Sequence, residues 1–201
     1  MGTLTIGFLL LTAFVFFFPS SLIDREFSEE VQEHHNLILD TIMKAISWFG
    51  YLPNAPITVT SIALIFFYFK YKKEALFLLS TLLSGVVSSI IKLLINRPRP
   101  SEPLVRIIVR TQQQSFPSGH VLFYVLFFGF LTFLMYEIKT IPKFIKVTVS
   151  VISLLFIFTI PYSRVYLGAH WFTDVAAGFL LGLICLYVLS VLYLKKLSIK
   201  K

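Results

Sequence analysis

The chain has 201 residues, of which 57% are hydrophobic and only 14% are charged, and its mean hydropathy is +0.83. A soluble domain carries charge on about 25% of its residues, so this composition argues against a water-facing globular protein and indicates a membrane protein. The net charge of +8 does not indicate a nucleic-acid partner, because the basic residues form short runs between apolar segments, and the single Cys185 excludes both an intrachain disulfide and a cysteine-based metal site.

Six apolar segments are each long enough to cross a bilayer, which takes about 17–25 helical residues. They lie near residues 2–19, 53–71, 74–95, 118–137, 143–161 and 174–194. The first is expected to remain as a span, since it lacks a positively charged start and Phe16–Pro19 is not a small-residue cleavage site. We therefore predict an all-α, polytopic bundle of six transmembrane helices, forming a single membrane-embedded domain over residues 1–201.

An acidic stretch separates the first two predicted spans. It contains Asp24, Glu26, Glu29, Glu30 and Glu33. Apolar residues then recur at helical spacing, at Val31, Ile38, Ile42, Ala45 and Phe49. This pattern predicts an amphipathic helix lying in the membrane interface, with Ser28 as its N-cap.

The distribution of basic residues predicts the orientation. One set of connections carries Lys70, Lys72, Lys73, Lys139, Lys143, Lys146, Lys195, Lys196, Lys200 and Lys201. By the positive-inside rule this face and both termini are cytoplasmic. The opposite face carries Arg97, Arg99, Arg106, Arg110 and Arg164. The assignment therefore requires that some of these arginines have roles that outweigh their effect on topology.

Three polar clusters interrupt the apolar pattern, all on the predicted non-cytoplasmic face. In the first, Lys92 and Arg99 are seven residues apart and would share one helix face if the helix continued. Pro98 and Pro100 are expected to end the helix, which places Arg99 at its exit. An unpaired ammonium is costly inside an apolar segment, so the alternative to a binding role is that Lys92 snorkels to the interface.

The second cluster, Pro117-Ser118-Gly119-His120, opens the fourth span. A helix start with serine and glycine offers an anion free backbone N–H groups, a hydroxyl and the positive end of the helix dipole. His120 would then lie beside that anion. The alternative is an ordinary capped helix start.

The third cluster runs from Ser163-Arg164 to His170 and Asp174, which are four residues apart and are expected on one helical face. A carboxylate that accepts the proton of one ring nitrogen leaves the lone pair of the other nitrogen free. Gly178 and Gly182 follow Asp174 at the same four-residue spacing, and Ser80, Ser84 and Ser88 form a similar stripe on another span. Close helix packing is the alternative explanation for both stripes.

A metal site is the alternative for the same residues, because His120, His170 and Asp174 are three candidate ligands. The positive charges of Lys92, Arg99 and Arg164 would oppose a divalent cation and favour a phosphate. The sequence therefore predicts no metal and no cofactor.

The joint pattern resembles the signature of the type 2 phosphatidic acid phosphatase superfamily, which includes glucose-6-phosphatase and vanadium-dependent haloperoxidases. The matching positions are Lys92, Arg99, Pro100, Pro117, Ser118, Gly119, His120, Ser163, Arg164, His170 and Asp174. The resemblance covers about residues 74–194. The short, six-span chain is similar to bacterial phosphatases of phosphatidylglycerol phosphate or undecaprenyl pyrophosphate.

The resemblance implies that His170 attacks phosphorus to form a phosphohistidine, that Asp174 orients it, and that His120 protonates the leaving oxygen. It implies that the phosphoryl oxygens are bound by Lys92, Arg99, Ser118, Gly119 and Arg164. The expected partners are a lipid phosphate, such as phosphatidylglycerol phosphate, phosphatidic acid or undecaprenyl pyrophosphate, and the membrane lipids. No nucleic acid or obligate protein partner is expected.

The expected location is the cell membrane, with a multi-pass chain and an extracytoplasmic site. The loop from Ser101 to Ser115, with Arg106, Arg110 and three glutamines, is expected to cover the head group. The alternative function is a non-enzymatic transporter with a polar relay. A sugar phosphatase also remains open, whereas six apolar spans disfavour a soluble haloperoxidase.

Overall fold

The computed structural model describes residues 1–198, with side chains placed as far as Lys195, and this part of the chain is helical without a strand. The predicted all-α class is confirmed. Lys200 and Lys201, which were assigned to the cytoplasmic face, lie outside the described residues, as does the side chain of Lys196.

Four segments are individually long and apolar enough to cross a membrane. The first is formed by α5 (Lys72–Ser80) together with α6 (Leu83–Ile95), and the others are α7 (Gly119–Glu137), α8 (Lys143–Tyr166) and α9 (Phe172–Ser198). Within α9, the candidate span is Phe172–Lys195. Two further spans result if each of two bent pairs counts as one. The first pair is α1 (Gly2–Phe17) with α2 (Leu22–Gln32), bent by 98°. The second is α3 (Leu37–Ser47) and η1 (Trp48–Gly50) with α4 (Asn54–Tyr68), bent by 61°. The protein is therefore a multi-pass membrane protein.

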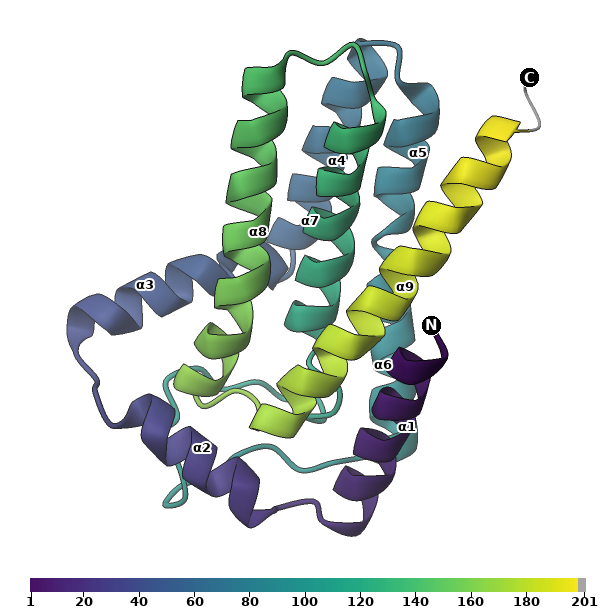
Figure 1. The fold of residues 1–201 in the computed structure, drawn as a ribbon. Helices are drawn as coiled ribbons and strands as arrows, with labels where there is room; N and C mark the ends of the chain where they lie inside the picture. Colours follow the sequence, from purple (N-terminus) through teal and green to yellow (C-terminus); the bar gives the residue numbers. More distant parts are fainter. Residues whose placement is uncertain (199–201) are drawn as a thin grey trace.

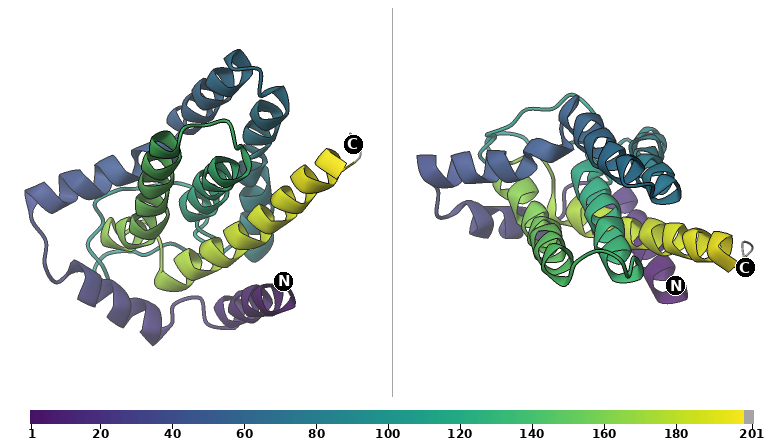
Figure 2. Two further views of the ribbon diagram at one scale, coloured as in Figure 1. Left: turned by 45° about the horizontal axis from the view of Figure 1, so that its top comes forward. Right: turned by 90° about the horizontal axis from the view of Figure 1, so that it is seen from above.

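Helix α7 occupies the middle of the bundle, with α8 and α9 on one side and α4 to α6 on the other (Figures 1 and 2). Its apolar residues cover the whole circumference, as expected for a helix surrounded by protein. Phe123, Phe127 and Phe130 lie in the core, whereas Leu155 and Phe158 of α8 are exposed on the outside of the bundle. The exposed apolar surface is consistent with contact to lipid.

The region between the first two spans contains two amphipathic helices, α2 and α3, rather than one. Ser28 is not the N-cap, because it lies inside α2 and donates to the carbonyl of Asp24 at 2.7 Å. The cap is Ser21, whose hydroxyl accepts from the Asp24 amide, and a second cap at Asn36 starts α3. The apolar spacing continues across the break at residues 33–36, which is why periodicity alone predicted one helix.

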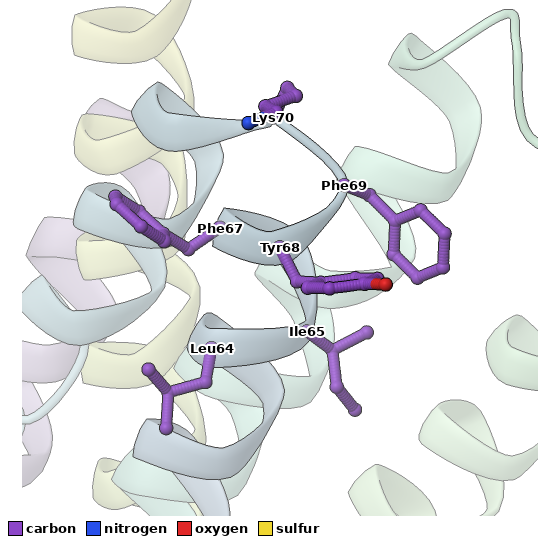
Figure 3. A pocket seen from close by; sticks show the side chains of 6 residues that line it. All are labelled: Leu64, Ile65, Phe67, Tyr68, Phe69 and Lys70. Atoms are coloured by element: carbon purple, nitrogen blue, oxygen red, sulfur yellow. The ribbon is translucent and has the colours of Figure 1, made fainter.

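The two ends of the bundle differ in chemistry. The lysine-rich connections α4–α5 and α7–α8 lie at one end, α2 and the loop after α6 lie at the other, and α3 projects sideways from the bundle between the two ends (Figure 1). At the lysine-rich end, a shallow hollow is lined by the last turns of α4 and by Lys70, with Tyr68 and Phe69 among its aromatic residues (Figure 3). Aromatic residues beside a lysine are typical of a membrane interface, and no residue of the three polar clusters lines this hollow.

Close packing of α7 against α9 requires glycine at position 182. A Cβ built there would lie 2.7 Å from Cβ of Val125, whereas a Cβ at Gly85 would meet nothing within 4 Å. We predict that Gly182→Ala lowers the stability by about 1–3 kcal/mol through overpacking. Gly85→Ala is the matched control and should leave the stability unchanged or raise it by up to about 1 kcal/mol. Thermal unfolding in detergent checks both, and equal midpoints would contradict the packing described here.

Candidate active site

A cavity of about 530 Å³ opens at the end of the bundle opposite the lysine-rich connections. The predicted site residues that line it are Lys92, Arg99, Gly119, His120, Arg164 and His170. Ser118 and Asp174 are fully buried beside them. Leu82, Val86 and Phe123 form part of an apolar wall. The three polar clusters, which are far apart in the sequence, therefore meet at one site.

Lys92 and Arg99 point into the bundle and hold the loop that precedes α7. Helix α6 ends at Ile95, so Arg99 lies beyond its exit as predicted. Lys92 is 5% exposed, and its Nζ donates to the carbonyls of Gln114 at 2.5 Å and Ser115 at 3.2 Å. Snorkelling of Lys92 to the interface is thus contradicted.

Arg99 lies against the predicted nucleophile. Its Nη1 donates to the carbonyl of Ala169 and lies 3.3 Å from Nε2 of His170. Burial, followed by the charge of Arg164, lowers the pKa of Arg99 to about 10, which leaves the guanidinium positive at neutral pH. Nε2 of His170 therefore faces the cationic side of the cavity.

The start of α7 has unused hydrogen-bonding groups. Ser118 is the N-cap residue, but its side chain makes no capping bond, and among residues 1–198 neither Ser118 Oγ nor His120 Nε2 has a hydrogen-bond partner. Both atoms are buried. An ordinary capped start would use the serine hydroxyl, so the free groups favour the anion-binding interpretation.

His170 and Asp174 do not share a helical face, contrary to the prediction from their spacing. Because α9 begins at Phe172, His170 lies in the turn before the helix and not on its face. Asp174 Oδ2 accepts from the Trp171 amide at 2.9 Å, which folds the turn back over the start of the helix. The Nδ1 of His170 lies 3.6 Å from Oδ2, and Ser115, which donates to the same oxygen, lies 3.5 Å from Nδ1.

The surroundings of His170 favour its neutral form. Burial, followed by the charges of Arg99, Lys92 and Arg164, holds the pKa of His170 well below its usual value. Since Nδ1 faces the carboxylate and Nε2 faces the cavity, the arrangement suits a neutral imidazole with its lone pair on Nε2.

Arg164 is fully buried and only half satisfied. Its Nη1 donates to Ser47 Oγ at 3.0 Å and to the Tyr51 hydroxyl at 2.8 Å. In the part of the chain that the structure describes, its Nε and Nη2 have no partner. A buried guanidinium with unpaired donors is costly, so these atoms are available for an anion.

Several residues of the site were not predicted, and they come from the first half of the chain. The rings of Tyr51 and His120 contact each other edge to face, with centroids 4.6 Å apart. Gly50 lies so close that a Cβ there would be 2.3 Å from Cδ2 of His120. Arg97 joins Asp24 to Asp174. No local motif marks these contacts. The only signals in the sequence are the charged residues themselves, Asp24 in the acidic stretch and Arg97 directly before Pro98.

In the loop from Ser101 to Ser115, which is expected to cover the head group, the two arginines do not line the cavity. Arg106 is held by both oxygens of Asp40, at 2.7 and 3.1 Å, and Arg110 is near Glu102 at 3.9 Å on the surface. Of the loop from Ser101 to Ser115, Thr111 and Gln113 line the cavity. Arg97 and Arg106 are thus in ion pairs, and Arg99 and Arg164 line the cavity.

Within the described residues, His120, His170 and Asp174 do not form a group that could hold a metal ion. The charged groups that converge on the cavity are cations and imidazoles, which suits an anionic ligand.

These features define a helical membrane protein with two histidines and several cations around one cavity at the end of the bundle. The family model of the PAP2 superfamily matches residues 73–198, and the chain belongs to this superfamily. The resemblance noted in the sequence is thereby confirmed.

Three curated relatives are similar in sequence. Phosphatidylglycerophosphatase B of Bacillus subtilis is 32% identical over 142 residues, 67% of this chain and 65% of that protein. Lipid A 4'-phosphatase of Porphyromonas gingivalis is 31% identical over 188 residues, 84% and 75% of the two chains. Undecaprenyl-diphosphatase of Sulfolobus acidocaldarius is 32% identical over 130 residues, 63% and 57%. The matches to the Bacillus and Sulfolobus proteins span less than two thirds of those relatives.

Two solved structures share the fold. The crystal structure of a transmembrane PAP2 type phosphatidylglycerolphosphate phosphatase from Bacillus subtilis aligns with a TM-score of 0.84 at 24% identity, over 96% of this chain and 95% of that one. Aquifex aeolicus LpxE aligns with a TM-score of 0.65 at 23% identity, over 82% and 92%. Both support the helical membrane fold.

The unpartnered donors of the site lead to a prediction about anion binding. Arg164→Gln should weaken binding of orthovanadate about 10- to 100-fold, because a charge-assisted hydrogen bond contributes about 1.5–3 kcal/mol. Ser118→Ala removes a neutral donor and should weaken it about 2- to 10-fold. Arg106→Gln is the control and should bind normally. Titration calorimetry on the detergent-solubilised protein measures all three, and equal affinities would refute the assignment.

Proposed function

We propose that this protein is an integral membrane phosphatase that hydrolyses the phosphate monoester or pyrophosphate of a lipid through a phosphohistidine on His170. The observation that carries the proposal is the set of unpartnered polar atoms on Ser118, His120 and Arg164, which lie around the same cavity as Nε2 of His170. A phosphoryl group supplies the oxygens that such a set of donors lacks.

In the proposed reaction, Nε2 of His170 attacks phosphorus while the bond to the lipid oxygen breaks. His120, as the imidazolium, gives that oxygen its proton. Asp174 faces Nδ1 and stabilises the positive charge that develops on the His170 ring. A water then attacks the phosphohistidine, returns a proton to His120 and releases inorganic phosphate.

The cations and the helix start act on the phosphoryl oxygens. Lys92, Arg99 and Arg164 neutralise the charge on the non-bridging oxygens, and Ser118 with the Gly119 amide donates hydrogen bonds to them. Phosphoryl transfer depends mostly on positioning and charge stabilisation, which these groups provide without a metal ion. Lys92 and Arg99 are already fixed by the loop carbonyls, so little reorganisation is needed on binding.

The substrate class follows from the walls of the cavity. Apolar side chains of α6 and α7 continue from the cationic end toward the apolar middle of the bundle. A lipid phosphate can place its head among the cations and leave its tail in the bilayer. The relatives named for phosphatidylglycerol phosphate, lipid A and undecaprenyl diphosphate support this class, and phosphatidic acid belongs to it as well.

The proposed orientation places the lysine-rich end and both termini in the cytoplasm and the site on the extracytoplasmic side. Of the five arginines that counted against this orientation, Arg97 and Arg106 form ion pairs, Arg99 and Arg164 line the cavity, and Arg110 lies at the surface near Glu102. Because four of the five are paired or line the site, the lysine distribution is used to assign the orientation.

The direct test is phosphate release from phosphatidylglycerol phosphate, phosphatidic acid and undecaprenyl pyrophosphate by purified protein in excess EDTA. We predict release in EDTA for the wild type, and a loss of at least about 1,000-fold for His170→Ala with orthovanadate still bound. No release from any lipid would favour the non-enzymatic transporter. Loss in EDTA that magnesium or zinc restores would refute the metal-free scheme.

The pH dependence tests the charge states of the two histidines. The pKa of His170 is depressed, so this ring stays neutral and reactive down to a pH below about 6.5 and activity falls only under that value. A bound phosphate brings negative charge beside His120 and favours its imidazolium in the complex, so turnover should fall again at alkaline pH, where that proton is lost. We therefore predict a bell-shaped profile of kcat, and a flat profile from about pH 5 to 9 would contradict it.

A further inference from the structure

Three fully buried charged side chains form a chain behind the cavity. Arg97 Nη2 lies 2.6 Å from Asp24 Oδ2, and its Nη1 lies 2.5 Å from Asp174 Oδ1. All three side chains are 0% exposed. Asp24 belongs to α2, Arg97 to the loop after α6, and Asp174 to the first turn of α9. The chain therefore connects an interfacial helix to the carboxylate that faces His170.

Asp24 also caps α9 from outside. Its Oδ1 accepts from the amide of Thr173 at 2.9 Å, and the Thr173 hydroxyl contacts both of its carboxylate oxygens. The first amides of a helix lack internal partners, so a carboxylate there stabilises the helix start. The position of this first turn, and so of Asp174, depends on a residue 149 positions earlier in the chain.

Arg97 determines which oxygen of Asp174 faces the histidine. It occupies Oδ1, and Oδ2 is left for Ser115, the Trp171 amide and the Nδ1 side of His170. Asp24 in turn balances the charge of Arg97, which a buried guanidinium requires. Without Arg97, two buried carboxylates would remain with their counter-ion removed.

Helix α2 presents opposite faces to lipid and to this network. Leu22 and Ile23 are exposed, whereas Asp24 and Ser28 are buried. Phe27 stacks on Phe172 at the start of α9, with ring centroids 4.1 Å apart. The contact with α9 is thus both apolar and ionic.

We propose that Arg97 and Asp24 are positioning residues for the His170–Asp174 pair, so that the interfacial helix α2 forms part of the catalytic apparatus. This inference rests on the proposed function. Neither residue lines the cavity, and each acts through Asp174. Arg97 fixes the carboxylate, and Asp24 fixes both Arg97 and the first turn of α9.

The experiment compares kcat, KM and orthovanadate affinity for full-length variants in detergent. Arg97→Gln should lower kcat about 100-fold, because misplacement of a catalytic pair by about 1 Å has an effect of this size. KM and the vanadate affinity should change less than about threefold, since the phosphate-binding groups are untouched. Arg97→Lys should fall between wild type and Arg97→Gln, because one ammonium cannot bridge two carboxylates as a guanidinium does.

Asp24→Asn tests the far end of the chain. It keeps an acceptor for the Thr173 amide but removes the counter-ion of Arg97, and it should lower kcat about 10-fold with KM again unchanged. Should Arg97→Gln not fold, Arg97→Lys and Asp24→Asn decide: a kcat within threefold of wild type in both would overturn the proposal.

The matched control is the ion pair of Asp40 and Arg106, which links the neighbouring interfacial helix α3 to the same long loop at 2.7 Å. It contacts neither His170 nor Asp174. Asp40→Asn and Arg106→Gln should keep kcat within threefold of wild type. An equal loss of kcat in these controls would show that docking of the interfacial helices alone is responsible and would overturn the proposal. If the proposed function itself is wrong, the wild type releases no phosphate. If only the positioning role is wrong, the wild type is active and the Arg97 and Asp24 variants keep its kcat.

Discussion

The carboxylate of Asp174 joins the separate parts of the catalytic end of this bundle. One oxygen accepts from Arg97, and the other accepts from Ser115 and the Trp171 amide and faces His170. These groups come from the loop after α6, the segment before α7 and the turn before α9. Because the carboxylate is fully buried, loss of any donor would leave charge without compensation in a region of low dielectric constant. The position of His170, the proposed nucleophile, therefore depends on this side chain.

An apolar bundle tolerates several cations at one end because each has a different kind of partner. Lys92 and Arg99 are bound by backbone carbonyls of the loop before α7, and Arg97 by two carboxylates. Arg164 keeps unpaired donors. Binding of an anion would satisfy these donors. The unpaired donors of Arg164 destabilise the empty site, and the same donors stabilise the complex with a phosphate. Stability and affinity are thus linked at this residue.

The helical class, the extent of the last four spans and the clustering of the three polar motifs could be predicted from the sequence, since each follows from local composition or spacing. The relation of His170 to Asp174 was predicted for the wrong reason. Their spacing fits one helical face, but the helix starts between them and a capping bond to Trp171 brings them together. Periodicity gave no sign of the break between α2 and α3, which depends on the caps Ser21 and Asn36.

The contributions of Asp24, Gly50 and Tyr51 could not be predicted, because each depends on a contact with a distant part of the chain. Asp24 is one of five acids in the stretch between the first two predicted spans, and it is the one that is buried against Arg97. Gly50 is required by the close approach of His120, which only the folded chain creates. Residues that support a site from outside its motifs carry no local sequence pattern. Only their contacts in the folded structure identify them.

Trapping a phosphohistidine on His170 is the most direct test of the proposed reaction. Purified protein would be mixed with a lipid phosphate, quenched in alkali, where phosphohistidine survives, and digested for mass spectrometry. We predict a phosphoryl group on His170 in the wild type and none at this position in His170→Ala. Phosphate release with no phosphorylated His170 at early times, or with the phosphoryl group on another residue, would contradict it.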